Sequence, residues 1–195
     1  MTAGRARAVA ARAAGLAASL GLALTVLVAT SASWPPERWT LAVRGLGWIA
    51  LGALLLSLAA SPVSRLAGRI TPKAAAIPFS ALRRALGITA ALAALAHALA
   101  STATLVAPAW LTLVTWPHLR AGVGALLILC ALLATSFTNI QRALRIRLWK
   151  PLHRATYAAA LLTALHVLSS PTAPRLTLLA PFAALLALRV VGGRS

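Results

Sequence analysis

Three histidines in apolar segments are the residues of this chain best suited to chemistry. His153 and His166 lie on one Ala- and Leu-rich stretch, and His97 lies among alanines on another. No charged residue lies between Tyr157 and Leu168. Ionisable residues inside a membrane span are costly and are therefore functional candidates. Neutral imidazoles in such surroundings suit axial ligation of haem iron, so these histidines predict a haem site.

The composition predicts an integral membrane protein. Of the 195 residues, 61% are hydrophobic and 10% are charged, and the mean hydropathy is +0.88. Soluble domains are only about half apolar, so this chain has too few charges to cover a water-facing surface. Its length suits a single domain over residues 1–195. The net charge of +18 does not indicate nucleic-acid binding, because the basic residues lie between apolar runs and form no continuous stripe.

The scarcity of carboxylates and thiols excludes several functional classes. Glu37 is the single acidic side chain. A paired-carboxylate catalytic site, a carboxylate-rich calcium or di-iron site and a carboxylate proton relay are therefore excluded. Cys130 is the single cysteine, which excludes an intrachain disulfide, a four-cysteine zinc site and an iron–sulfur cluster. In its apolar setting we expect a buried, inert thiol.

Hydropathy predicts an all-α bundle of six transmembrane helices. The apolar runs are long enough to span a bilayer, and the expected spans are residues 13–30, 43–60, 86–103, 121–137, 152–170 and 176–191. The first run has an alternative interpretation as a signal peptide, because basic residues precede it and Ser31-Ala32-Ser33 resembles a cleavage site. Its length of about 18 residues favours a retained helix.

Prolines and tryptophans mark the expected ends of the spans. Ser61-Pro62 should end the second span, because proline disfavours helix at the residue before it. Basic loops are expected after the second and fourth spans, with Arg65, Arg69, Lys73, Arg83 and Arg84 in one and Arg142, Arg145, Arg147 and Lys150 in the other. The loop before the fourth span holds Pro108, Trp110, Trp116, Pro117 and His118. His118 is then either a solvated interfacial residue or part of a partner-docking surface.

The distribution of basic residues predicts the orientation in the membrane. With six spans, both termini share one side, and that side carries fifteen of the 19 Lys and Arg residues. These are Arg5, Arg7, Arg12, Arg65, Arg69, Lys73, Arg83, Arg84, Arg142, Arg145, Arg147, Lys150, Arg154, Arg189 and Arg194; the other four are Arg38, Arg44, Arg120 and Arg175. Because basic residues concentrate on the cytoplasmic side, both termini are expected in the cytoplasm.

Depth in the membrane indicates which histidines can share an iron. His97 follows Arg84 by thirteen residues, and His166 follows His153 by thirteen. At 1.5 Å per residue, His97 and His166 both lie roughly 20 Å from the cytoplasmic edge. We therefore expect them to be axial ligands of one outer haem. His153 would lie on the inner side, opposite Arg83 and Arg84, so a second haem there would need a sixth ligand other than histidine, or none.

Two further patterns bear on this site. Ala90, Ala93, Ala94 and Ala100 share the helix face of His97. That face offers either room for a flat macrocycle or a surface for close helix packing. The Gly-x-Gly at 122–124 follows no strand, so it does not predict a dinucleotide site.

Two groups of motifs lie between the second and fifth expected spans. The first is Ser61-Pro62, Arg83-Arg84-Ala85-Leu86-Gly87 and His97, and the second is Thr135-Ser136, Gln141-Arg142, Leu144, Trp149, Leu152-His153-Arg154, Tyr157 and His166. The first group gives this part of the chain a resemblance to ferric reductase-like transmembrane proteins, and the second to the MsrQ family within them. This resemblance implies a six-helix b-type cytochrome of the bacterial inner membrane that passes electrons to MsrP, a periplasmic molybdopterin methionine sulfoxide reductase. The family binds haem b, is also associated with FMN, and has three histidines that match His97, His153 and His166.

The resemblance also indicates what this chain lacks. NADPH oxidases of the wider superfamily carry a second histidine on the third span and a cytosolic flavin domain, and this sequence has neither. Its electron donor is therefore expected to be external, a cytosolic flavin reductase or a quinone. The chain is interpreted as an electron-transfer subunit, with no catalytic residue of its own.

Two alternatives remain at this point. One is a ferric reductase-like haem reductase that acts with a separate cytosolic flavoenzyme. The other is a haem-free helical transporter or scaffold, although the near-absence of carboxylates argues against a proton-coupled transporter.

Overall fold

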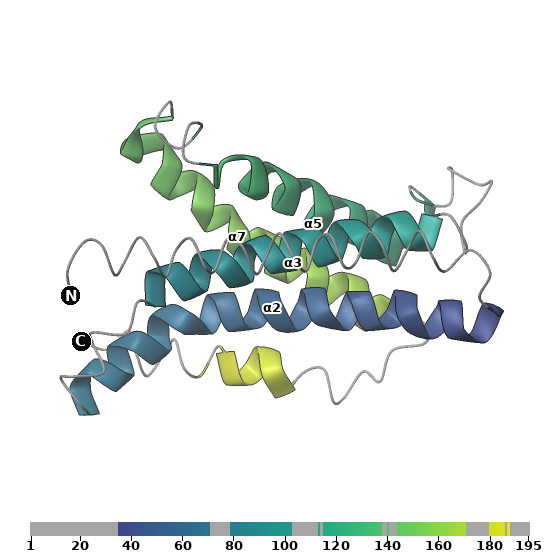
Figure 1. Ribbon diagram of the computed structural model, residues 1–195, viewed down its shortest axis with the longest axis horizontal. Helices are drawn as coiled ribbons and strands as arrows, with labels where there is room; N and C mark the ends of the chain where they lie inside the picture. The colour runs from purple at the N-terminus through teal and green to yellow at the C-terminus, as the bar shows by residue number, and fades with distance from the viewer. Residues whose placement is uncertain are drawn as a thin grey trace.

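The computed structural model describes residues 35–70, 79–102, 113, 115–137, 140, 144–170, 180–185 and 187. Four long helices lie in these ranges: α2 (Pro36–Ile70), α3 (Phe79–Ser101), α5 (Pro117–Ala134) and α7 (Arg145–Ser169) (Figure 1). Residues 180–185 are also helical. The expectation of an all-helical protein is confirmed for the described residues.

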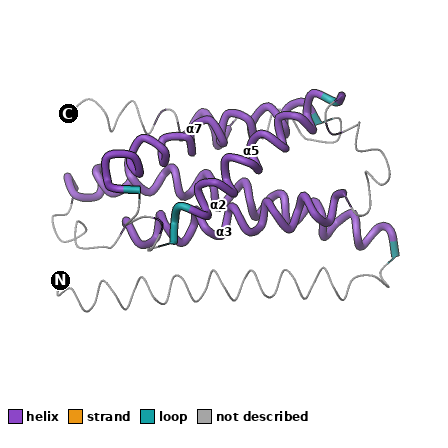
Figure 2. Tube along the Cα trace, turned by 90° about the horizontal axis from the view of Figure 1, so that it is seen from above, coloured by secondary structure: helices purple, strands orange, loops and turns teal. Residues whose placement is uncertain are grey.

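The four helices form two antiparallel pairs. α2 packs along α3, and α5 packs along α7, whereas α3 meets α5 less extensively and α2 meets α7 less extensively still. Figure 2 shows the α2–α3 pair lying beside the α5–α7 pair. Helices joined by short connections pack against each other in this way because each buries an apolar stripe on its neighbour in the chain. The two pairs then leave room between them for a site.

A core of small and branched residues joins the two pairs. Leu54 and Leu58 of α2, Ala90 of α3, Leu129 of α5 and Ala159 of α7 belong to one buried cluster. A second cluster lies within the α2–α3 pair, where Val43 and Leu46 pack against Ala93 and Ala100. Small residues let helix backbones approach closely, which is how helices associate in membranes without a hydrophobic driving force.

Three of the described helical segments are long and apolar enough to cross a membrane: Pro36–Leu66, Ser80–Ser101 and Pro117–Ala134. They carry large apolar side chains on their outer surfaces, including Leu41, Leu56 and Leu127, which are 58–68% exposed in the absence of lipid. α7 does not join this group, since it carries His153, Arg154 and His166. Span 13–30 and most of span 176–191 lie outside the described residues, so the count of six stays a prediction.

The prediction that Ser61-Pro62 ends the second span was wrong, because α2 continues to Ile70. Proline lacks the N–H that would bond to the carbonyl four residues earlier and normally kinks a helix. Here the Pro62 side chain is fully buried, and Arg83 of α3 donates to the Ser61 hydroxyl at 3.2 Å. Contacts with α3 therefore offset the lost bond, and Figure 1 shows the last turns of α2 angled away from its main axis.

The loops before α3 and α7 are shorter in the structure than predicted. α3 begins at Phe79 and α7 at Arg145, so several basic residues expected in loops lie in helices: Arg65, Arg69, Arg83, Arg84, Arg145, Arg147 and Lys150. Lys and Arg are good helix formers, so the helices can continue past the apolar segments. Pro117 and His118 lie in the first turn of α5, where proline is favoured. Lys73, Pro108, Trp110 and Arg142 are outside the described residues.

Candidate functional site

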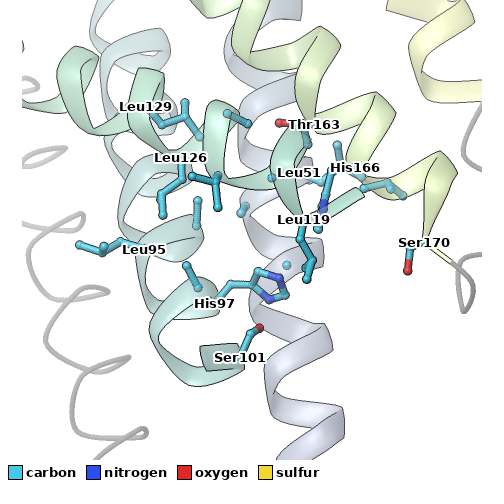
Figure 3. Close-up of a pocket in the computed structure, with 18 of the residues that line it drawn as sticks. Leu51, Leu95, His97, Ser101, Leu119, Leu126, Leu129, Thr163, His166 and Ser170 are labelled. Carbon is cyan, nitrogen blue, oxygen red and sulfur yellow. The ribbon is translucent and has the colours of Figure 1, made fainter. Parts of the chain in front are cut away.

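A cavity of about 670 Å³ lies between the two helix pairs and is lined by all four long helices (Figure 3). This volume is typical of sites for small molecules and cofactors. Most of the lining is Leu, Ala, Val or Gly, with His97 from α3 and His166 from α7. Arg44 is the one Lys, Arg, Asp or Glu side chain in the described lining. The site is therefore apolar, with two imidazoles and one guanidinium as its chemically distinctive groups.

His97 and His166 lie close together, with ring centroids 6.4 Å apart and ring planes at 72°. Figure 3 shows both side chains reaching into the space between α3 and α7. A metal–imidazole bond is about 2 Å long, and the ring centre lies about 1 Å beyond the nitrogen, so imidazoles sharing one metal have centres about 6 Å apart. The observed separation fits two ligands of a single metal atom. Ligation itself stays a prediction.

Hydrogen bonds fix the tautomer of both rings. His97 Nδ1 donates to the Val43 carbonyl at 2.8 Å, and His166 Nδ1 donates to the His118 carbonyl at 2.7 Å. A carbonyl can only accept, so each Nδ1 carries the hydrogen and a neutral ring keeps its lone pair on Nε2. Metal-ligating histidines are held in this way, with the other ring nitrogen bonded to a carbonyl or carboxylate. The donor set therefore suits haem iron.

Two glycines lie against these rings, and the sequence did not reveal their role. A Cβ built on Gly47 would lie 3.2 Å from His97 Nδ1, and one built on Gly122 would lie 2.8 Å from His166 Nδ1. In the sequence, Gly122 stands out only as part of a Gly-x-Gly pattern that does not predict a dinucleotide site, and Gly47 belongs to no recognised pattern. The signal in the sequence was a glycine inside an apolar span. It indicates a contact with a histidine only once the helix that packs against the glycine is known.

His118 belongs to the same cluster. Its ring stacks on His166 with centroids 6.2 Å apart and planes at 30°, and Trp116 contacts it edge-on at 5.5 Å. Trp116 is 53% exposed, so these three rings lead from the cavity to the surface. Beyond the two interpretations open from the sequence, the structure gives His118 a third role, as the backbone acceptor for His166.

His153 lies apart from the other three histidines. It is near the N-terminal end of α3 and the C-terminal end of α5. Its ring packs against Trp149 with centroids 4.2 Å apart and ring planes tilted by 39°, and its Nε2 makes a long contact of 3.5 Å with the Thr135 hydroxyl. The charges of Arg83 and Arg84 act on this ring, so His153 lies near these two arginines, as expected from its position along the helix. All four histidines of the chain are described, and none pairs with His153. The described residues also contain no group of three or more His, Cys, Asp or Glu that could hold a metal ion.

The alanine face of α3 is used mainly for helix packing. Ala90, Ala93 and Ala100 are at most 1% exposed and belong to the buried clusters with α2. Ala94 packs against the first of these clusters and also lines the cavity. Close helix packing, one of the two purposes considered from the sequence, is therefore confirmed, and room for a macrocycle stays a prediction. Cys130 is free and partly buried.

Comparison with known families identifies the class of protein that this fold and cavity define. Residues 46–164 match the family described as ferric reductase like transmembrane component. The match covers more than half of the chain, so the chain belongs to this family of membrane proteins. It includes His97 and His153 and stops two residues before His166. No curated protein and no solved structure matches the chain.

Proposed function

We propose that this chain is the membrane subunit of an electron-transfer system, a b-type cytochrome that carries electrons across the bacterial inner membrane. The observation that supports this most is the pair His97 and His166. Each ring is bonded through Nδ1 to a backbone carbonyl, and each presents Nε2 in an apolar cavity. Membership of the ferric reductase-like family points to the same function.

In this proposal, one haem b is held by Nε2 of His97 and Nε2 of His166. Haem iron with two imidazole ligands supplies reversible one-electron transfer. The residues around it have three tasks. Leu51, Leu126 and Leu129 line the cavity and exclude water. The two carbonyls orient the imidazoles, and Arg44 supplies a positive charge suited to carboxylate groups of the ligand.

The donor side is proposed at the end of the bundle that carries His153. Arg83 and Arg84 place positive charge near His153, which suits an anionic donor such as a flavin phosphate. A cytosolic flavin reductase is therefore the favoured donor over a quinone, and FMN is a candidate cofactor there. The basic end faces the cytoplasm in this proposal, with both termini on that side. A second haem held by His153 is less well supported, because no other histidine lies near it.

The proposed acceptor is a periplasmic methionine sulfoxide reductase of the MsrP type. This part of the proposal rests on the resemblance of the stretch from Thr135 to His166, which includes Trp149 and Tyr157, to the MsrQ family. The family match itself also favours a second candidate, a membrane reductase that passes electrons from a separate cytosolic flavoenzyme to ferric complexes. The two differ in acceptor and not in the haem site.

The test is spectroscopic. The protein is purified in detergent with haem supplied during expression, and its absorption is recorded oxidised and after dithionite reduction. The expected result is a low-spin b-type spectrum with one haem per chain. The reduced protein is then mixed with MsrP or with ferric citrate, and reoxidation is followed. Fast reoxidation by MsrP and not by ferric citrate supports the subunit that donates to MsrP. Fast reoxidation by ferric citrate and not by MsrP supports the ferric reductase. A protein that binds no haem contradicts both candidates.

A further inference from the structure

The same local arrangement occurs twice at the cavity, once in each helix pair. In the α2–α3 pair, His97 donates to the carbonyl of Val43, and Gly47 lies four residues after that carbonyl. In the α5–α7 pair, His166 donates to the carbonyl of His118, and Gly122 lies four residues after it. In both pairs the glycine and the acceptor are on the first helix and the histidine is on the second.

Helix geometry explains why the spacing is four. The carbonyl of residue i accepts the N–H of residue i+4. Every Cα–Cβ bond in a helix tilts toward the N-terminus, so the side chain at i+4 covers the carbonyl at i. A glycine at i+4 leaves this carbonyl open from the side. Since a carbonyl oxygen has two lone pairs, it can then accept both its helical N–H and an imidazole from a neighbouring helix.

We propose that Gly47 and Gly122 are positioning residues for the two imidazoles. Each opens a notch in its helix that admits a histidine ring to an otherwise covered carbonyl, and so fixes both the orientation of the ring and the tautomer that leaves Nε2 for metal. This inference deepens the proposed haem site and rests on it for its functional meaning. The geometry of the notches exists in the chain without any bound group.

The two notches differ in tightness. At Gly122, an added Cβ would lie 2.8 Å from His166 Nδ1 and 3.1 Å from Cε1, which is too close for the ring to stay where it is. At Gly47, the nearest atoms of His97 would lie at 3.2 Å, so the ring would need to move by a few tenths of an ångström. We therefore expect the alanine variant of Gly122 to have the larger effect.

The chain provides matched controls in the same helices. Gly45 of α2 has nothing within 4 Å of its added Cβ. Gly124 of α5 would meet the Leu162 Cδ1 atom at 3.2 Å, the same distance as the nearest contact at Gly47. Gly124→Ala therefore adds crowding between α5 and α7 without touching a histidine. Alanine is a better helix former than glycine, so neither control should weaken its helix.

The first experiment compares haem binding in Gly47→Ala, Gly122→Ala, Gly45→Ala and Gly124→Ala. The rate of haem loss is measured by transfer of haem to apomyoglobin. Electron paramagnetic resonance gives the g values of the ferric haem, which report the relative orientation of the two imidazoles. Loss of an outer-shell partner typically costs about tenfold or more in metal affinity. We expect losses of this size with altered g values in Gly122→Ala, smaller ones in Gly47→Ala, and wild-type behaviour in both controls.

The second experiment does not depend on haem. The ¹⁵N spectrum of the histidine rings is recorded in the apo protein. Wild type and controls should show His97 and His166 with protonated Nδ1 and unprotonated Nε2, and each notch variant should lose this tautomer at its own histidine only. If wild type binds no haem but shows these tautomers, the notches stand and the proposed function falls.

Two outcomes overturn the inference itself. One is a notch variant that folds and keeps the tautomer, the g values and the haem-loss rate of wild type. The other is an equal effect of Gly124→Ala, because crowding alone would then explain the result. If Gly122→Ala does not fold, Gly47→Ala carries the test, since its ring has to move only slightly.

Discussion

His97 and His166 come from different helix pairs, yet their ring centroids lie 6.4 Å apart. Each ring is tied to the first helix of its own pair, His97 to Val43 and His166 to His118. Neither pair contains both histidines, so the apposition exists only when the two pairs are packed together.

Replacing either histidine should remove the same haem. We expect His97→Ala and His166→Ala each to abolish the low-spin spectrum completely, because both are proposed as ligands of one haem iron. The measurement is the reduced-minus-oxidised spectrum with the haem-to-protein ratio. His153→Ala is the matched control and should keep the signal, since His153 lies away from this pair. Distinct spectral losses in the two variants would show that the histidines do not share an iron.

His153→Ala should slow entry of electrons and leave the outer haem intact. Its ring lies beside Trp149 at the end of the bundle near Arg83 and Arg84, which is where an anionic donor is proposed to approach. Stopped-flow reduction of the haem by a flavin reductase system should be slower than in wild type, by about tenfold if the ring lies on the path. Equal rates would leave His153 with the structural role of packing on Trp149.

Arg44→Gln should lower the midpoint potential of the haem. The guanidinium is the one Lys, Arg, Asp or Glu group in the described cavity lining, and a nearby positive charge favours the reduced, less positive state of the iron. Its removal should shift the potential downward by roughly a few tens of millivolts, given the Coulomb energy of an exposed charge. Arg120→Gln, which does not line the cavity, is the control. Redox titration measures the shift, and an upward shift would contradict the assignment.

Reporter fusions test the orientation. Fusions after Ser195 and near Arg69 should report cytoplasm, and fusions near Glu37 and Ala109 should report periplasm. The reason is the bias of fifteen basic residues against four between the two sides. Alkaline phosphatase and green fluorescent protein fusions give complementary readings. A periplasmic C-terminus would falsify both the count of six spans and the placement of the donor side.

The pairing of His97 with His166 could be predicted from the sequence because the expected depth of a residue depends on rise along the helix. Thirteen residues separate Arg84 from His97 and His153 from His166, and the fixed rise per residue predicts one depth for both histidines. The structure brings their ring centroids to 6.4 Å from each other. Rotation about the helix axes is a different matter. It decides which carbonyl each ring meets, and so the roles of Gly47 and Gly122 could not be predicted.

The end of α2 shows a second feature that could not be predicted from the sequence. A proline after a serine normally predicts a boundary, but helix α2 continues through Pro62. The reason lies in another helix, since Arg83 bonds to Ser61 and the Ser57 hydroxyl donates to the Arg83 carbonyl at 3.1 Å. Local preference was overridden by contacts between residues more than twenty positions apart. Such contacts are not visible in a local pattern.

The sparse packing between the two helix pairs has a consequence for how the protein is made. Each pair is extensively packed within itself, whereas contacts between the pairs are fewer. The pairs can therefore form as separate hairpins during membrane insertion and meet afterwards. A haem bound by His97 and His166 would then cross-link the two hairpins, and ligand binding would stabilise the joined state by mass action. In this proposal, haem binding would be the last step of assembly. The supply of haem would then set the fraction of chains in which the two hairpins are joined.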